Sequence, residues 1–169
     1  MTDIAITDVA EGDVGAIVDL IRALAAHEGR PDAATVGAEA LTDLLFGPLA
    51  IAHGLIARRV GAPVGYALFG VKFASFTGAR LLYIDDIFVH QNVRGHGLGT
   101  GFMAALAREA VRRGCAAMEW SALDDNDQAL GFYDRLGAIE KTGIRYFRTD
   151  GADLSRLADA AMHFQEQGG

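Results

Sequence analysis

The sequence lacks several features that mark particular protein classes. Its single cysteine, Cys115, excludes an intrachain disulfide and any paired-cysteine metal motif. Its most apolar stretch, residues 44–57, contains glycine, proline and histidine and is too short to span a bilayer. The five histidines show no paired, metal-binding spacing. We therefore predict a protein without a metal and without a membrane segment.

Positive charge is also scarce. Lysine and arginine together number 15 against 22 aspartates and glutamates, which gives a formal net charge of −7. An acidic chain repels phosphate backbones at long range, so we predict that it does not bind nucleic acid. The same field suits a small cationic substrate. Residues 1–4 show neither the basic nor the apolar part of a leader peptide, which predicts a cytoplasmic protein.

Length and composition are those of one folded domain. The chain has 169 residues and no repeat, linker or low-complexity stretch, so we predict a single domain over residues 1–169. Hydrophobic residues make up 51% and charged residues 22%, which excludes intrinsic disorder. Glycine is the exception, because 21 of 169 residues is about 12% against a usual value near 7%.

Hydrophobic periodicity predicts the order of helices and strands. A strand over 4–7 precedes helices over 13–27 and 37–46. Three apolar runs separated by glycine-containing turns, over 49–59, 64–73 and 80–89, predict an antiparallel meander. After residue 89, the pattern predicts a helix that ends at 112–114, a strand over 116–122 and a helix over 126–136. One or two short strands within 138–149 and a helix over 153–165 are predicted to follow. This order predicts an α+β fold with a sheet flanked by helices.

A glycine-rich loop carries the sharpest chemical signal. Residues 94–101 read Arg-Gly-His-Gly-Leu-Gly-Thr-Gly, and they follow a predicted strand and open a predicted helix. The N–H groups at a helix N-terminus are unpaired, and glycines let them close around a phosphate oxygen. Arg94 can add charge-assisted hydrogen bonds. The signatures of a Walker loop and of a Rossmann fingerprint are absent. We predict an anion-binding loop, and the alternative is a tight turn that serves packing.

A second motif follows about 30 residues later. Residues 126–138 read Asn-Asp-Gln-Ala-Leu-Gly-Phe-Tyr-Asp-Arg-Leu-Gly-Ala, where Asn126 suits a helix N-cap and Gly137 a helix end. Together with the glycine loop, this motif resembles the GNAT superfamily of N-acetyltransferases, whose members bind acetyl-coenzyme A. Residues 17–28, residues 82–89 and the Tyr133 motif are similar to the branch that acetylates diamines, spermidine and thialysine. Ile144 departs from this branch, which commonly has an aromatic residue there.

The resemblance implies a fold and a cofactor site. The fold is a central mixed, mostly antiparallel sheet, splayed between the strand that ends at Val89 and the strand that starts at Ala116. The branch also implies a homodimer whose terminal segments exchange. The implied acetyl-coenzyme A site comprises Ile87, Phe88, Val89, Arg94, Gly95, His96, Gly97, Leu98, Gly99, Thr100, Asn126, Ala129 and Tyr133.

Acidic residues suit the chemistry of such an enzyme. The amine has a pKa near 10, so it binds as a cation and must lose a proton before it attacks the thioester. Asp85 and Asp86 interrupt an apolar strand, where an acid is unfavourable without a partner. Their side chains point to opposite faces unless a bulge intervenes. The resemblance places Asp85 where the branch has a substrate-contacting glutamate, so we predict that Asp85 is catalytic. The alternative for both aspartates is an ion pair with an arginine or a cap on a neighbouring loop.

Two further carboxylates are predicted to bind substrate with Asp85 and Asp86. Glu28 ends the first helix, and the resemblance places that segment at the substrate end of the site. Its alternative is a solvated helix-end carboxylate. Glu119 lies on the strand that follows Cys115. No residue stands out as a sole general base, so we predict a water relay to Asp85, Asp86 or Glu119.

The resemblance also implies how charge is handled on the thioester. Tyr133 occupies the position of the general acid, which gives a proton to the departing thiolate. Because the phenol has a pKa near 10 and the thiol a pKa near 8.5, this transfer is uphill by roughly 2 kcal/mol. The alternative is a core aromatic residue. Backbone N–H groups of residues 87–89 would stabilise the thioester oxygen, which requires an interrupted strand ladder.

The sequence thus predicts an N-acetyltransferase that uses acetyl-coenzyme A. Its predicted substrate is a small cationic amine, either a diamine or polyamine or a thialysine-like amino acid, and the predicted reaction is direct attack in a ternary complex. The alternatives are acetylation of a protein, a peptide or another small amine, and a non-catalytic sensor of acyl-coenzyme A.

Overall fold

The computed structural model describes residues 4–166. The chain divides into two compact units, one ending at Leu123 and the other beginning at Asp124. The first unit contains the whole sheet, and the second contains two helices. That the whole chain is one domain stays a prediction.

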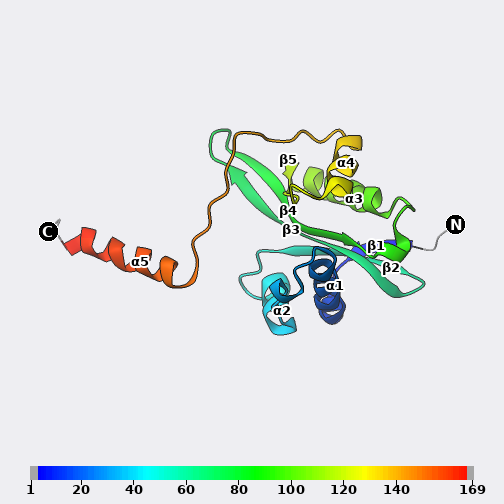
Figure 1. Ribbon diagram of the computed structural model, residues 1–169, viewed down its shortest axis with the longest axis horizontal. Coiled ribbons are helices and arrows are strands. Elements are labelled where there is room, and N and C mark those ends of the chain that lie inside the picture. Colours follow the sequence, from blue (N-terminus) through cyan, green and yellow to red (C-terminus); the bar gives the residue numbers. More distant parts are fainter. Residues whose placement is uncertain (1–3, 167–169) are drawn as a thin grey trace. The chain divides into compact units, whose positions relative to one another are not determined.

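The sheet in the first unit has five strands in the order β1-β2-β3-β4-β5. The first four pair antiparallel, and β5 pairs parallel to β4. This arrangement confirms the predicted α+β fold with a mixed, mostly antiparallel sheet (Figure 1). The strands are β1 (Ile4–Asp8), β2 (His53–Arg59), β3 (Ala62–Ala74), β4 (Ala79–Val89) and β5 (Cys115–Glu119).

Helices cover both faces of this sheet. The helices α1 (Val14–His27) and α2 (Ala38–Phe46) lie on one face, and α3 (Leu98–Arg112) lies on the other (Figure 1). Three short 3-10 helices complete the unit: η1 (Glu11–Asp13), η2 (Pro31–Ala33) and η3 (Gln91–Val93). Apolar residues recur at three- and four-residue spacing along α1, so one stripe of that helix faces the sheet.

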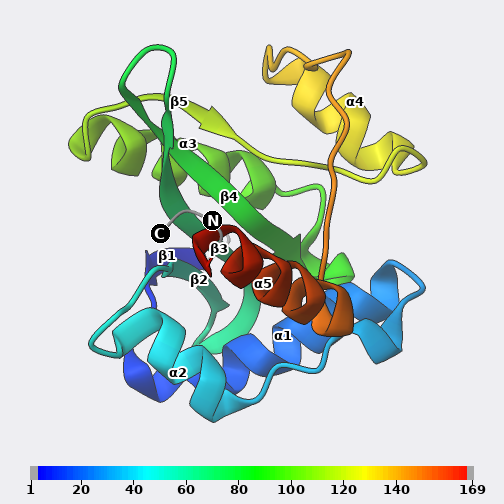
Figure 2. The ribbon, with the colours of Figure 1, turned by 90° about the vertical axis from the view of Figure 1, so that its left-hand side faces the viewer.

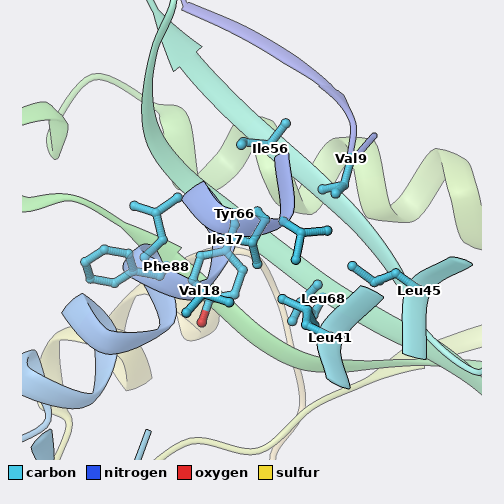
Figure 3. Packing of buried hydrophobic residues seen from close by; sticks show 11 residues of the cluster. Val9, Ile17, Val18, Leu41, Leu45, Ile56, Tyr66, Leu68 and Phe88 are labelled. Carbon is cyan, nitrogen blue, oxygen red and sulfur yellow. The ribbon is translucent and has the colours of Figure 1, made fainter. Parts of the chain in front are cut away.

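The core beneath α1 and α2 includes two aromatic residues, Tyr66 and Phe88. Both side chains pack among aliphatic residues from the two helices and from β2 and β3 (Figure 3). Ile17 and Tyr66 are fully buried. The cluster comprises Val9, Val14, Ile17, Val18, Leu20, Leu41, Leu45, Ile56, Tyr66, Leu68 and Phe88.

The sheet opens between β4 and β5. The two strands pair only from Arg80 opposite Cys115 to Tyr83 opposite Glu119. Beyond Tyr83, β4 continues to Val89 with no strand beside that edge among residues 4–166. Figure 2 shows the two strands diverging. The predicted splay is therefore confirmed.

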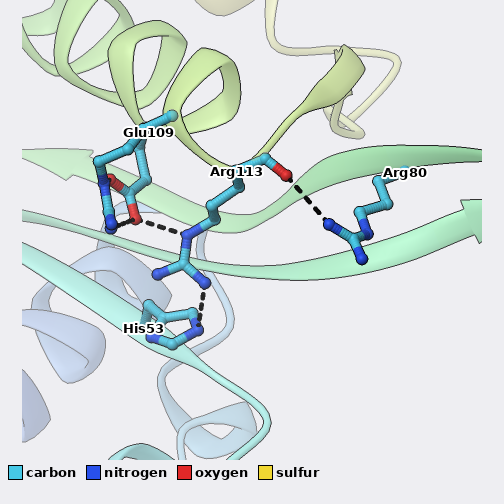
Figure 4. A network of polar contacts seen from close by, with 5 residues as sticks. His53, Arg80, Glu109 and Arg113 are labelled. Atoms are coloured by element: carbon cyan, nitrogen blue, oxygen red, sulfur yellow. Dashed lines mark hydrogen bonds and ion pairs between the residues drawn. The ribbon is translucent and has the colours of Figure 1, made fainter.

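A polar network fastens the far end of α3 to β2 (Figure 4). Arg113 pairs with Glu109 and donates from Nη1 to His53 Nε2 at 2.8 Å. Hydrogen bonds from Arg112 and Arg113 lower the pKa of Glu109 to about 2. Burial and the nearby Arg113 charge lower the pKa of His53, which keeps its ring neutral as an acceptor. Arg80 donates to the Arg113 carbonyl oxygen at 3.5 Å.

The second unit corrects part of the predicted secondary structure. It contains α4 (Asp127–Arg135) and α5 (Gly151–Glu166). The prediction of one or two strands within residues 138–149 is wrong, because the structure places no strand there. The segment contains apolar and aromatic residues between turns, but a strand also needs a neighbouring strand to pair with its backbone groups. Ile139 and Phe147 are each 91% exposed, so this segment lacks the half-buried surface of a sheet.

Candidate active site

Two glycines determine the backbone shape of the loop between β4 and α3. Gly95 and Gly97 have φ angles of 80° and 76°, in the left-handed region that favours glycine. Gly97 is the N-cap of α3, and the first helical hydrogen bond joins the Gly101 N–H to the Gly97 carbonyl at 2.9 Å. The N–H groups of residues 98–100 therefore lie ahead of the helical bonding pattern, at the positive end of the helix dipole.

Arg94 holds this loop against the end of β4. Its Nε donates to the Val89 carbonyl oxygen at 2.9 Å, and its guanidinium carbon lies 6.0 Å from the centre of the Phe88 ring. His96 Nδ1 donates to the Arg94 carbonyl oxygen at 2.9 Å. The arginine that was predicted to contact an anion thus also fixes the loop on the strand that precedes it.

The open edge of β4 meets the requirement for an oxyanion site. The His90 N–H donates to the Val64 carbonyl at 2.9 Å, on the side of β3. Because successive residues of an antiparallel strand point their N–H groups to opposite sides, those of Ile87 and Val89 point away from β3. That is the edge where β4 lacks a neighbouring strand beyond Tyr83, within the part of the chain that the structure describes. The interrupted ladder that the chemistry needs is present.

A β-bulge at Asp85 determines how the two aspartates are presented. Leu68 lies opposite Asp86, whereas the next residue of β3, Phe69, lies opposite Ile84, so Asp85 is an extra residue. Residues opposite one another share a face, so Asp86 lies with Leu68 on the face covered by α1 and α2. Asp85 is exposed and Asp86 is half-buried.

The half-buried carboxylate of Asp86 has a partner in the core. The Tyr66 hydroxyl donates to Asp86 Oδ2 at 3.2 Å. Burial raises the pKa of Asp86, the negative charge of Asp85 raises it further, and the hydrogen bond from Tyr66 lowers it. Burial and the charge of Asp86 raise the pKa of Tyr66, so the phenol remains a hydrogen-bond donor.

Glu28 completes an acidic cluster with Asp85 and Asp86. It is the C-cap residue of α1, it is partly buried, and it pairs with Arg30. Its negative charge contributes to the raised pKa values of both Asp86 and Tyr66. Asp85 and Asp86 are thus neighbours on β4, and the charge of Glu28, at the end of α1, acts on Asp86.

Glu119, the fourth carboxylate predicted to bind substrate, has a different partner. Its Oε2 lies 2.5 Å from the Nζ of Lys72, which in turn sits 4.8 Å from the centre of the Tyr83 ring. Glu119 and Tyr83 are the last paired residues of β5 and β4. A substrate-binding role for Glu119 stays a prediction.

The second unit carries the predicted cofactor motif on α4. The Asn126 side chain accepts a hydrogen bond from the Ala129 N–H at 3.1 Å, which confirms the predicted N-cap. Tyr133 is half-buried within α4, and its ring centre lies 5.3 Å from that of Phe132. Burial raises the pKa of Tyr133, so its phenol stays protonated at neutral pH.

Tyr66 is the site residue that the sequence analysis missed. The signal was a tyrosine inside the apolar run Val-Gly-Tyr-Ala-Leu-Phe, residues 64–69. A buried tyrosine hydroxyl needs a hydrogen-bond partner, and the next predicted strand offered two carboxylates. The bulge that makes Asp86 the partner was not predictable from either strand alone.

Comparison with known proteins identifies the family to which this open mixed sheet and its glycine loop belong. The model of the acetyltransferase (GNAT) family matches residues 23–138. The chain belongs to this family and is an N-acetyltransferase. Enzymes of the family use acetyl-coenzyme A.

Curated relatives match between about half and nearly all of the chain. The thialysine N-epsilon-acetyltransferase of Bos taurus is 34% identical over 169 residues, which cover 94% of this chain and 99% of that protein. The L-ornithine N5-acetyltransferase of Arabidopsis thaliana is 36% identical over 93 residues, which cover 55% of this chain and 41% of that protein.

Solved structures show the same fold. A soil-metagenome aminoglycoside acetyltransferase, solved with sisomicin, has a TM-score of 0.75 and 22% identity, and the match covers 88% of this chain and 97% of that one. The aminoglycoside N-acetyltransferase AAC(6')-Iy, solved with coenzyme A, has a TM-score of 0.71 and 19% identity, and the match covers 89% and 97% of the two chains.

None of the helices within residues 4–166 combines the length and hydrophobicity that crossing a bilayer requires. The same residues contain no group of three or more histidine, cysteine, aspartate or glutamate side chains placed to hold a metal ion.

Proposed function

We propose that this N-acetyltransferase acetylates the primary amine of a small substrate that carries a second positive charge, such as a diamine, a polyamine or a thialysine-like amino acid. The acidic cluster of Glu28, Asp85 and Asp86 carries this proposal. It lies on the strand that leads to the glycine loop and at the end of α1. Several carboxylates in one place favour a ligand with more than one cation.

The names of the relatives support this class of substrate. Thialysine, ornithine, and spermidine and spermine occur in the names of relatives that align with this chain. Each of these compounds carries at least two amino groups. The acidic cluster would bind the second, charged amino group of such a substrate while the first amino group reacts.

The proposed cofactor site uses the residues that the motifs predicted. The pyrophosphate of acetyl-coenzyme A would accept hydrogen bonds from the N–H groups at the start of α3, where the left-handed glycines leave room. In the first unit the proposed site comprises Ile87, Phe88, Val89, Arg94, Gly95, His96, Gly97, Leu98, Gly99 and Thr100. The cofactor-binding role of Asn126, Ala129 and Tyr133 rests on the family motif that they carry.

The proposed mechanism is direct attack of the amine on the thioester carbonyl. Asp85 and Asp86 hold the ammonium group and take its proton through water, because only the neutral amine is nucleophilic. The N–H groups of Ile87 and Val89 donate to the thioester oxygen as it gains negative charge. Tyr133 gives its proton to the departing thiolate.

We also propose that the protein is a cytoplasmic homodimer. Ile139, Ile144 and Phe147 are exposed in the connection between α4 and α5, and this apolar surface suits an exchange of terminal segments between two copies. A mass of two chains in sedimentation equilibrium is expected, and a monomer at micromolar concentration would contradict the dimer.

A substrate survey tests the proposed function. Release of coenzyme A thiol from acetyl-coenzyme A would be measured with diamines, polyamines, lysine analogues, single-amine amino acids, aminoglycosides and peptides. We expect turnover with compounds that carry two or more close cations and little with the single-amine amino acids. Preference for peptides would contradict the small-substrate proposal. Tight binding of acetyl-coenzyme A with no turnover of any amine would contradict the enzymatic function and indicate a sensor of acyl-coenzyme A.

The Gly97→Ala variant tests the anion-binding loop. A Cβ atom in the left-handed region costs about 1–2 kcal/mol, so the loop should shift and the affinity for coenzyme A should fall roughly tenfold in calorimetry. Gly61→Ala is the matched control, because Gly61 has a φ of 82° in the turn between β2 and β3. The control should lose stability but keep its affinity for coenzyme A. Equal affinities in the two variants would refute this role of the loop.

A further inference from the structure

A tyrosine hydroxyl lies beneath the acidic cluster and has no role in the proposed mechanism. Tyr66 comes from the middle of β3 and is fully buried between the sheet and α1 (Figure 3). Its ring centre lies 6.3 Å from that of Phe88. Its hydroxyl donates to Asp86 Oδ2 at 3.2 Å. A phenylalanine would fill the same space, so only the hydroxyl distinguishes this position from ordinary packing.

We propose that Tyr66 is a positioning residue for acetyl transfer, whose hydroxyl holds one oxygen of Asp86 so that the carboxylate stays charged and its other oxygen, Oδ1, is left for the substrate amine. This inference rests on the proposed function, because it gives Asp86 the task of binding and deprotonating an amine. It adds a residue to the site that acts through Asp86 and does not touch the substrate.

The surroundings of Asp86 explain why the carboxylate needs a donor. Asp85 lies next to it on β4, Tyr66 faces it from β3, and Glu28 at the end of α1 adds a second negative charge. Arg30 pairs with Glu28 and so offsets part of that charge. Burial and the two neighbouring carboxylates favour the protonated form of Asp86. The Tyr66 hydroxyl opposes this effect, because a hydrogen bond to a carboxylate stabilises its charge.

The geometry also restricts the carboxylate. A charge-assisted hydrogen bond to Oδ2 limits rotation of the Asp86 carboxyl group. The hydroxyl itself is fixed because the Tyr66 ring packs within the core. A catalytic carboxylate that is held by a rigid element keeps its geometry when the substrate arrives.

The first test measures Asp86 directly and needs no substrate. Carbon-13 NMR of the side-chain carboxyl groups would follow the titration of Asp86 in the wild type and in Tyr66→Phe, with Asp86→Asn used to assign the signal. We expect the titration midpoint of Asp86 to move to higher pH in Tyr66→Phe, because the stabilising donor is gone. Tyr83→Phe removes a hydroxyl from β4 and serves as the matched control with an unchanged midpoint. An Asp86 midpoint that does not move in Tyr66→Phe would overturn the inference.

The second test is the pH profile of turnover. We expect kcat/KM of Tyr66→Phe to be about tenfold below that of the wild type on the acidic limb, where Asp86 has gained its proton. The difference should narrow at high pH, where only the lost restraint on the carboxyl group remains. A uniform loss at every pH would indicate a structural role and contradict the inference. Wild-type protein that acetylates no amine would overturn the proposed function, whereas the NMR midpoint decides the interaction of Tyr66 with Asp86 independently of turnover.

Discussion

Replacing Tyr133 with phenylalanine is expected to lower kcat by roughly 10²- to 10⁴-fold, the usual contribution of a general acid. The variant cannot protonate the departing thiolate, and burial keeps the wild-type phenol protonated at neutral pH. The affinity for acetyl-coenzyme A should change little, because the ring that packs within α4 remains. Single-turnover kinetics and calorimetry measure the two quantities separately.

Tyr146→Phe is the matched control for this experiment. Tyr146 is 79% exposed in the connection between α4 and α5, so its hydroxyl should not affect turnover. A Tyr133→Phe variant with the turnover of Tyr146→Phe would show that the phenol is only a packing residue. An equal loss of turnover and of acetyl-coenzyme A affinity would instead assign Tyr133 to cofactor binding alone.

Replacing Asp86 with asparagine is expected to lower kcat/KM for a diamine by about 10²-fold or more. Asparagine has nearly the same shape and can still accept the Tyr66 hydrogen bond, so the fold should be kept. The variant loses the negative charge that holds the ammonium group and accepts its proton. Asp85→Asn should cost less, because Asp85 is exposed and its charge is screened by water.

The pH dependence of the wild type follows from the same carboxylate. Burial and the charge of Asp85 raise the pKa of Asp86, so its charged form and the activity should both disappear as the pH falls toward that raised pKa. Asp86→Asn should lack this acidic limb. Asp19→Asn makes the same chemical change on the exposed face of α1 and serves as the control. An acidic limb that persists unchanged in Asp86→Asn would contradict the role of Asp86.

The motif-bearing parts of the site were predictable because their structure is local. The glycines at 95 and 97 adopt left-handed conformations that only neighbouring backbone determines, and the loop opens α3 as expected. Asn126 caps α4 through a hydrogen bond that spans three residues. Local patterns also predicted the antiparallel meander, since turns separate the apolar runs.

Predictions that depended on distant partners were less complete. The segment over 138–149 has a strand-like pattern, but it forms no strand because pairing requires another strand at a suitable distance. The strand predicted over 116–122 ends at Glu119, where its pairing with β4 ends. In both cases the sequence pattern was compatible with a strand, and the availability of a partner decided the outcome.

The sequence by itself determined the family, the cofactor loop and the residue types of an acidic substrate site, because each depends on short stretches of chain with strong local preferences. Only the tertiary structure decided which acids act together. A bulge in β4 shifts the register by one residue, places Asp86 opposite Leu68 and within reach of the Tyr66 hydroxyl, and leaves Asp85 exposed. Register is a property of two paired strands, and packing against α1 then brings Glu28 to the same place.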